Sequence, residues 1–160
     1  HGCTEVRAVI EIAFRFNLLT PQYREWLLLE TGELLDADAA YEDAILHNDL
    51  VLNSLTRQIY WKQKSIDIDW LHEAKWSFMW ELAKHAKTGL PIDSTVFGER
   101  KSVDYVSKTK SGLTNLKGFP NELADAIEVV GTGTQQLKIE ASEIRLFEPH
   151  VGGDIREWTP

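Results

Sequence analysis

Apolar residues cover well over half the circumference of a helix that the pattern predicts over residues 69–89. At 100° per residue, the apolar members are Trp70, Leu71, Ala74, Trp76, Phe78, Met79, Trp80, Leu82, Ala83 and Ala86. Asp69 is a candidate cap for its start, Gly89 suits the left-handed position at its end, and Pro91 prevents its continuation. A helix this apolar is buried on several sides, so we expect the rest of the chain or a partner to pack around it.

Residues 5–16 alternate with a period of two, which predicts a strand with one buried face. Arg7, Glu11 and Arg15 fall on the polar face, and their four-residue spacing also fits a helix. The β-branched and aromatic content favours the strand.

Residues 20–88 read as three or four helices with short joints. Thr20-Pro21 has the pattern of a helix start, and Asp36 or Asp38 is a candidate cap for the next helix. An apolar stripe through Leu52, Leu55 and Ile59 extends the helical interpretation to about Trp61. The polar segment 62–65 then links to the central helix.

Residues 90–118 lack a regular pattern and predict a long loop, with a short strand over 103–106. Pro120-Asn121-Glu122 opens a helical turn, or a turn into the last segment. Two apolar runs around Gly131-Thr132-Gly133-Thr134 predict a hairpin, and Ser142-Glu143 shifts the alternation through a bulge or a second turn. We expect the tail, residues 150–160, to fray or to dock on a partner.

Taken together, these elements predict one α+β domain over residues 1–160. Because an isolated hairpin is marginal in water, we expect a small antiparallel sheet built from the N-terminal and C-terminal strands. The Trp-rich helical middle would then cover its apolar face. We assign His1 no function and treat residues 1–3 as terminal residues of the domain.

Composition restricts the class of protein. With 43% apolar and 26% charged residues, the chain is typical of a globular protein. Its net charge of −8, with a basic concentration only at Arg100–Lys117, argues against nucleic acid as a partner. The single cysteine, Cys3, excludes an internal disulfide and fits a reducing compartment. With no long apolar run and no leader-like start, we expect a cytoplasmic protein that has no membrane partner.

Four tryptophans gather around the central helix, and these are our candidates for a ligand or interface surface: Trp61, Trp70, Trp76 and Trp80. Tryptophans at four-residue spacing usually serve packing within a chain or between subunits. His72-Glu73 lacks the second histidine of a zinc-protease helix, since position 76 is Trp. Gly131-Thr132-Gly133 lacks the third glycine of a dinucleotide loop.

Two carboxylate pairs carry a resemblance to a known family. Leu-Leu-Leu-Glu30-Thr-Gly-Glu33 and Gly-Phe-Pro-Asn-Glu122-Leu-Ala-Asp125 resemble the two metal-binding motifs of the MazG-like all-α nucleotide pyrophosphatases. The resemblance implies that Glu30, Glu33, Glu122 and Asp125 hold Mg²⁺, which would polarise phosphate oxygens and activate a water. The sequence departs from the family at Gly32, inside the first motif, and after Asp125, where it becomes strand-like.

The sequence favours a non-catalytic role over this enzymatic alternative. We expect a binding or interaction module that self-associates through Trp-rich or sheet-edge surfaces and holds a small molecule or a protein partner, with a cleft between sheet and helices. That interpretation requires no cofactor, whereas the pyrophosphohydrolase alternative requires Mg²⁺.

Overall fold

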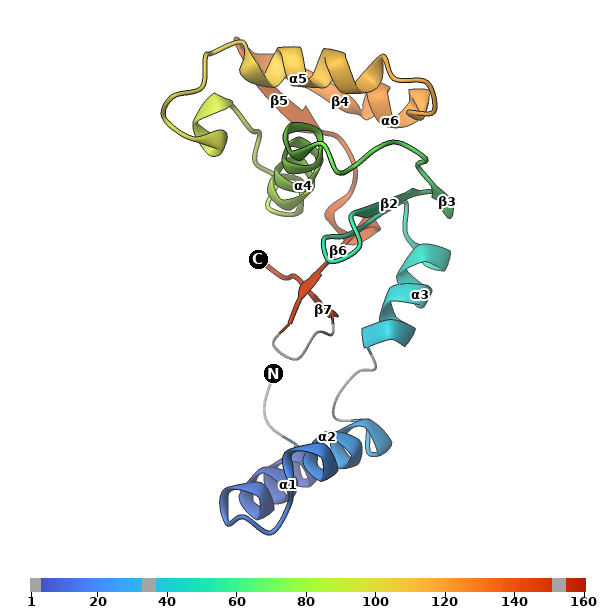
Figure 1. Ribbon diagram of the computed structural model, residues 1–160, viewed down its shortest axis with the longest axis vertical. Helices are drawn as coiled ribbons and strands as arrows, with labels where there is room; N and C mark the ends of the chain where they lie inside the picture. Colours follow the sequence, from blue (N-terminus) through green and yellow to red (C-terminus); the bar gives the residue numbers. More distant parts are fainter. Residues whose placement is uncertain (1–3, 33–36, 151–154) are drawn as a thin grey trace. The chain divides into compact units, whose positions relative to one another are not determined.

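The computed structural model describes residues 4–32, 37–150 and 155–160. The chain divides into two compact units, residues 1–40 and 41–160. We describe each unit by itself. The α+β class is confirmed, with helices in both units and two sheets in the second (Figure 1).

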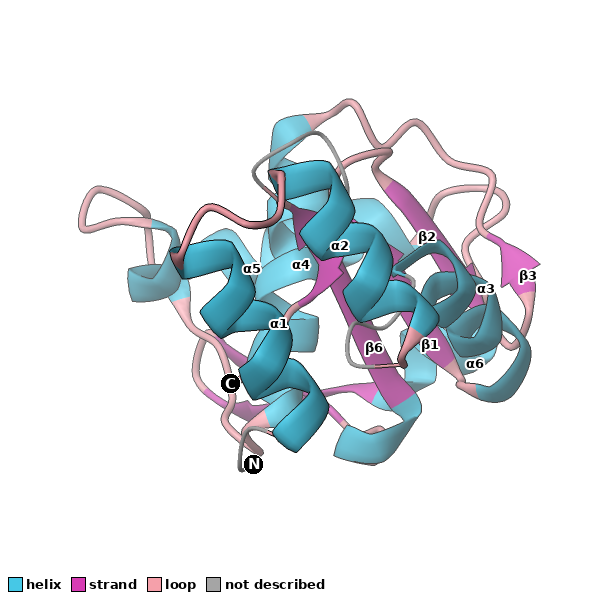
Figure 2. Cartoon of the chain, turned by 90° about the horizontal axis from the view of Figure 1, so that it is seen from below, coloured by secondary structure: helices cyan, strands magenta, loops and turns pink. Residues whose placement is uncertain are grey.

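The first unit contains two helices, α1 (Glu5–Arg15) and α2 (Pro21–Glu30), which pack side by side (Figure 2). The Thr4 hydroxyl caps α1 by accepting from the Arg7 N–H at 3.1 Å, and Thr20 caps α2 in the same way. The strand predicted over residues 5–16 is therefore wrong. Its apolar residues satisfy both periods, and the cap together with the four-residue spacing of Arg7, Glu11 and Arg15 favours the helix.

The second unit contains a five-stranded mixed sheet in the order β3-β2-β1-β6-β7. Its strands are β1 (Leu50–Asn53), β2 (Gln58–Trp61), β3 (Lys64–Ser65), β6 (Ile144–Pro149) and β7 (Ile155–Glu157). Strands β1 and β6 pair in parallel, and the other neighbours pair antiparallel. The sheet is thus not purely antiparallel, and the chain segment that pairs with the C-terminal strands is 50–53 rather than 5–16.

The helix predicted to run from Leu52 to Trp61 is instead the β1–β2 hairpin. Asn53 sets the turn, because its side-chain oxygen accepts from the backbone N–H groups of Leu55 and Thr56 at 3.0 and 3.2 Å. Helix α3 (Ala37–His47) precedes the hairpin. Of its two candidate caps, Asp36 lies outside the described residues, and Asp38 falls within the first turn.

Helix α4 (Glu73–Lys87) forms the centre of the second unit, as predicted. It lies between the five-stranded sheet and a layer made of α5 (Tyr105–Thr114) and the hairpin of β4 (Ile127–Gly131) and β5 (Thr134–Leu137) (Figure 1). The helix begins four residues later than Asp69, whose carboxylate closes a local turn by accepting from the Leu71 N–H. Gly89 has φ +72° and ends the helix: its N–H donates to Ala86, and the next N–H donates to His85.

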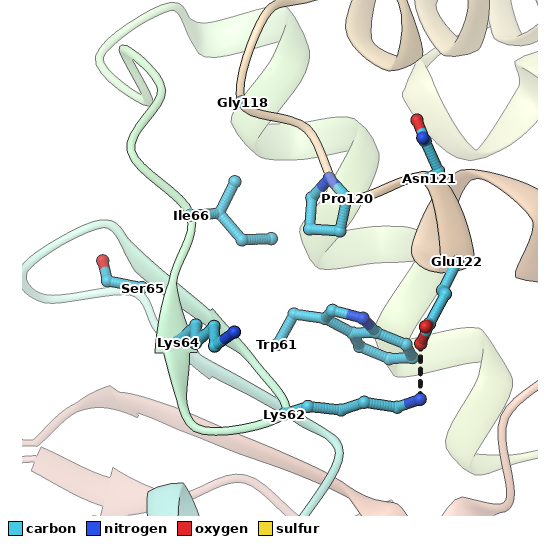
Figure 3. A pocket seen from close by; sticks show the side chains of 9 residues that line it. All are labelled: Trp61, Lys62, Lys64, Ser65, Ile66, Gly118, Pro120, Asn121 and Glu122. Atoms are coloured by element: carbon cyan, nitrogen blue, oxygen red, sulfur yellow. Dashed lines mark hydrogen bonds and ion pairs between the residues drawn. The ribbon is translucent and has the colours of Figure 1, made fainter.

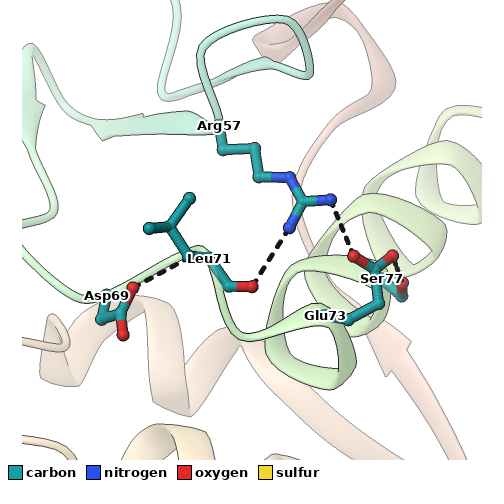
Figure 4. A network of polar contacts seen from close by, with 5 residues as sticks. All are labelled: Arg57, Asp69, Leu71, Glu73 and Ser77. Atoms are coloured by element: carbon teal, nitrogen blue, oxygen red, sulfur yellow. Dashed lines mark hydrogen bonds and ion pairs between the residues drawn. The ribbon is translucent and has the colours of Figure 1, made fainter.

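A polar network fixes the start of α4 against the β1–β2 loop (Figure 4). The Arg57 guanidinium donates to the Glu73 carboxylate at 2.7 Å and to the Leu71 carbonyl at 3.3 Å. Ser77 donates to the other Glu73 oxygen at 3.0 Å. The Arg57 and Ser77 hydrogen bonds lower the pKa of Glu73 below its ordinary value.

The segment predicted as a long loop contains η1 (Ser94–Phe97), a 3-10 helix, as well as α5. The short strand predicted over 103–106 is wrong, because α5 begins at Tyr105. Helix α6 (Asn121–Ala126) begins at the predicted helical turn. It leads directly into β4 (Ile127–Gly131) and β5 (Thr134–Leu137), which form the predicted hairpin.

The shift predicted at Ser142-Glu143 is a 3-10 turn, η2 (Ala141–Glu143), between β5 and β6. Part of the tail joins the sheet as β7. The core of the second unit is contributed mainly by β1, β2, α4, α5 and β6, and its fully buried members include Leu50, Leu52, Ile59, Phe78, Met79, Val106, Leu113, Ile144 and Leu146.

Candidate functional site

A pocket of about 470 Å³ lies between the β2–β3 turn and the segment that leads into α6. It lies entirely within the second unit (Figure 3). The hairpin supplies one wall and residues 118–122 supply the other; the lining residues are Trp61, Lys62, Lys64, Ser65, Ile66, Gly118, Pro120, Asn121 and Glu122.

The turn at the edge of this pocket has an unfavourable backbone for its sequence. Lys62 and Gln63 have φ values of +47° and +70°, the pattern of a two-residue hairpin turn that normally contains Asn-Gly. Each non-glycine residue in this region costs on the order of 1 kcal/mol. The Lys62 N–H donates to the Asp49 carbonyl at 2.8 Å, and the Gln63 side chain donates to the Leu46 carbonyl at 3.0 Å. These hydrogen bonds hold the strained turn in place.

An ion pair closes one side of the pocket. The Lys62 ammonium lies 2.5 Å from the Glu122 carboxylate and 5.2 Å from the centre of the Trp61 ring. The pair lowers the pKa of Glu122 and raises the pKa of Lys62 from their ordinary values. Because both side chains are more than half exposed, the pair contributes little to stability.

Lys64 supplies a second cation to the pocket, and none of the described carboxylates pairs with it. Its side chain has no hydrogen-bond or ion-pair partner among the described residues. Ser65 and Asn121 add a hydroxyl and an amide, while Ile66 and Pro120 add apolar surface. The pocket thus combines a free positive charge, neutral polar groups and an apolar wall, which are the features of a small-ligand site.

Of the four candidate tryptophans, only Trp61 lines this pocket. Trp70 and Trp76 are each 5% exposed, and their rings meet edge to face with centroids 6.4 Å apart. Trp80 stacks on Trp76 at 5.8 Å and is partly buried against the same core. The Trp70 indole donates to the Ile66 carbonyl at 3.1 Å. These three residues pack the interior of the second unit and offer little surface for a ligand.

The four carboxylates of the pyrophosphatase resemblance lie in different parts of the chain. Glu30 is exposed at the end of α2 in the first unit, and Glu33 lies outside the described residues. Glu122 and Asp125 are exposed on α6 in the second unit. Within the described residues no three His, Cys, Asp or Glu side chains are grouped to hold a metal ion. The convergence of the four carboxylates stays a prediction, which pyrophosphate release from a nucleoside triphosphate with Mg²⁺ tests.

Sequence reasoning identified Trp61 and Glu122 but missed Lys62 and Lys64. The signal was present, because a polar four-residue segment interrupts two apolar runs at positions 62–65. A polar segment of this length also fits a link into the central helix, and it contains none of the residues that usually mark a two-residue hairpin turn.

A scan of family models, a search of curated proteins and a search of solved structures each return no match to this chain. No helix among the described residues combines the length and the apolar character needed to cross a bilayer.

Proposed function

We propose that this chain is a non-catalytic, cytoplasmic binding module whose pocket at the β2–β3 turn takes a small organic anion. The observation that carries the proposal is Lys64, a cation that pairs with no described side chain and lies beside the apolar surface of Ile66 and Pro120. A ligand with one carboxylate or phosphate and a compact apolar part matches both features.

The strained turn supports this assignment. Positive φ at Lys62 and Gln63 costs stability, and strain of this kind is concentrated at functional sites. The turn brings Lys62 and Lys64 to the same pocket, and Glu122 neutralises the first. One net positive charge remains for an incoming anion.

The proposal is tested by ¹H–¹⁵N spectra of the chain titrated with a panel of small aromatic and aliphatic carboxylates and phosphates. The indole N–H resonance of Trp61, assigned with Trp61→Phe, should shift on binding. Lys64→Gln should weaken binding by a factor of about 10 to 150, because a charged hydrogen bond is worth roughly 1.5–3 kcal/mol.

The matched control is Lys138→Gln, just after β5, since Lys138 is another exposed lysine outside this pocket. It should leave the affinity unchanged. A panel without a binder at millimolar concentration would count against the site, as would a Lys64→Gln variant that binds as tightly as the parent.

We further propose that the module self-associates. Support comes from the first unit, where both helices leave apolar side chains exposed on one stripe each. These are Val6, Val9, Ile12 and Phe16 on α1 and at its end, and Tyr23, Trp26 and Leu29 on α2. Exposed apolar patches of this kind, on the order of several hundred Å², mark interaction sites. Two such helix pairs would form a four-helix bundle.

A further inference from the structure

The two lysines of the pocket at the β2–β3 turn differ, because only one of them has a counter-ion. Lys62 pairs with the Glu122 carboxylate at 2.5 Å, whereas Lys64 pairs with no described side chain. Ser65 and Asn121 line the same pocket and carry no charge. Glu122 is the only carboxylate among the described residues that line it, so two lysines and one glutamate leave the lining with a single net positive charge.

The hairpin places both lysines beside the ring of Trp61. Lys62 follows Trp61 in the chain, and its ammonium lies 5.2 Å from the centre of that ring. Lys64 is the cross-strand partner of Trp61, and partners of this kind place their side chains on the same face of a sheet. Figure 3 shows both lysines and Glu122 around the Trp61 ring. An anion that pairs with Lys64 in this pocket therefore approaches the Lys62–Glu122 pair.

Glu122 acts on an incoming anion in two ways. It occupies the Lys62 ammonium, and the same hydrogen bond lowers the pKa of Glu122 below its ordinary value, so this carboxylate is charged at neutral pH. It also places a negative charge at the pocket, which repels a second negative charge on a ligand. A monocarboxylate needs only Lys64. The second charge of a phosphate monoester meets no free cation among the described lining residues.

We propose that Glu122 makes this pocket selective for singly charged carboxylates over phosphate monoesters, an inference that rests on the anion-binding function proposed above. Specificity of this kind comes from a repulsive element directed at the wrong ligand as well as from contacts to the right one. Glu122 is the repulsive element, and Lys64 supplies the attractive contact. The ligand class is thereby narrowed to monocarboxylates with a compact apolar part, for which Ile66 and Pro120 supply surface.

The exposure of the ion pair sets the size of this effect. The Lys62 and Glu122 side chains are 51% and 70% exposed, and solvent screens charges at such positions. An interaction of this strength changes an affinity about two- to fivefold. The preference is therefore measured as a ratio of two dissociation constants, obtained under the same conditions for two ligands that differ in charge.

The test compares benzoate with phenyl phosphate, which share a phenyl ring and differ in the charge of the acidic group. At about pH 8 benzoate carries one negative charge and phenyl phosphate carries about two, because the second pKa of a phosphate monoester is about 6. Titrations of the full chain, followed by the Trp61 indole N–H resonance, give both dissociation constants. The parent chain should bind benzoate about two- to fivefold more tightly, and Glu122→Gln should remove or reverse this preference.

Glu128→Gln is the matched control, because this exposed carboxylate lies on β4 and outside the pocket. It removes the same charge and should leave the ratio of the two dissociation constants unchanged, with circular dichroism showing that both variants are folded.

Three results would overturn the selectivity and leave the anion site in place. They are a parent chain that binds phenyl phosphate at least as tightly as benzoate, a Glu122→Gln variant that keeps the parent's ratio, and a Glu128→Gln variant that shifts the ratio equally. If neither ligand binds the parent chain or Glu122→Gln at millimolar concentration, the anion site itself fails, and the selectivity fails with it.

Discussion

Tyr41 occupies a site where burial controls ionisation. Its ring meets Phe147 and Tyr60 edge to face, with centroids 5.1 and 6.3 Å apart. Burial, followed by the neighbouring Tyr60, raises the pKa of Tyr41 from 10.0 to about 12. The native state therefore keeps the phenol protonated in a range of pH where the unfolded chain loses that proton.

This shift makes stability depend on alkaline pH. The contribution of Tyr41 is fully present below pH 10 and is lost as pH rises toward 12, because the unfolded state then binds fewer protons. Tyr41→Phe should remove the latest step of the absorbance titration at 295 nm and flatten the alkaline fall in unfolding free energy. Tyr23→Phe, an exposed tyrosine, should leave that step in place. A late step that survives Tyr41→Phe would contradict the assignment.

Gly133 combines two constraints that can be separated by mutation. Its φ is +69°, and an added Cβ would lie 2.3 Å from the Val103 carbonyl, so Gly133→Ala should destabilise the chain by about 2 kcal/mol or more. Gly89 has φ +72° but open space around it, so Gly89→Ala should cost only about 1 kcal/mol. Urea denaturation of both variants measures the difference. Equal losses would mean that the hairpin tip does not press on the segment before α5.

At the scale of elements, prediction succeeded where the apolar positions fitted only the helical period or only the strand period. It failed where they fitted both. In residues 73–87 the apolar side chains cover most of the circumference of a helix, a pattern that only a buried helix explains, and this segment is α4. Residues 5–16 fit both periods, and the Thr4 cap that favours α1 lies just outside the window. In residues 50–61 the apolar spacing also fits a helix, while the turn at Asn53 depends on a side-chain hydrogen bond that periodicity does not register.

Two surfaces could not be predicted from the sequence for related reasons: the pocket at the β2–β3 turn and the exposed apolar stripe of α1. The turn at Lys62-Gln63 lacks the glycine or asparagine that usually marks a two-residue hairpin turn, and its conformation depends instead on hydrogen bonds to the Asp49 and Leu46 carbonyls. An N-terminal strand would have placed one set of apolar residues on one buried face. As helix α1, the segment leaves Val6, Val9 and Ile12 exposed instead.

The exposed stripes of α1 and α2 predict how the chain assembles. Val9 is 66% and Trp26 is 50% exposed, so replacing both with Glu should leave the fold intact but place charges in the bundle core. The dissociation constant of the double variant should be at least about tenfold higher than that of the parent chain, a change of about 1.4 kcal/mol in the free energy of association. Size-exclusion chromatography with light scattering measures it, with the exposed Gln22→Glu as control. A parent chain that is monomeric at micromolar concentration would contradict self-association, whereas a double variant that stays dimeric would move the interface to a sheet edge.

On the scale of the whole molecule, the two units differ in how much apolar surface they bury by themselves. The core cluster runs from Leu50 to Leu146 and lies wholly within the second unit. In the first unit Ile10 and Leu28 are the buried apolar residues among those described. Its helices have 11 and 10 residues, and isolated helices shorter than about 12–15 residues are marginal in water.

This asymmetry predicts that residues 37–160 fold without the first unit. A chain that starts at α3 keeps every strand of the sheet and the complete core cluster, so it should melt cooperatively, with a midpoint within about 4–8 °C of the parent, equivalent to roughly 1 kcal/mol. A peptide of residues 4–32 should show little helix by circular dichroism at low concentration and gain helix as concentration rises, because its apolar stripes are covered only on association. A truncated chain that melts without a transition would show that the second unit requires the first. A peptide that is fully helical when dilute would show that its short helices are stable without a partner.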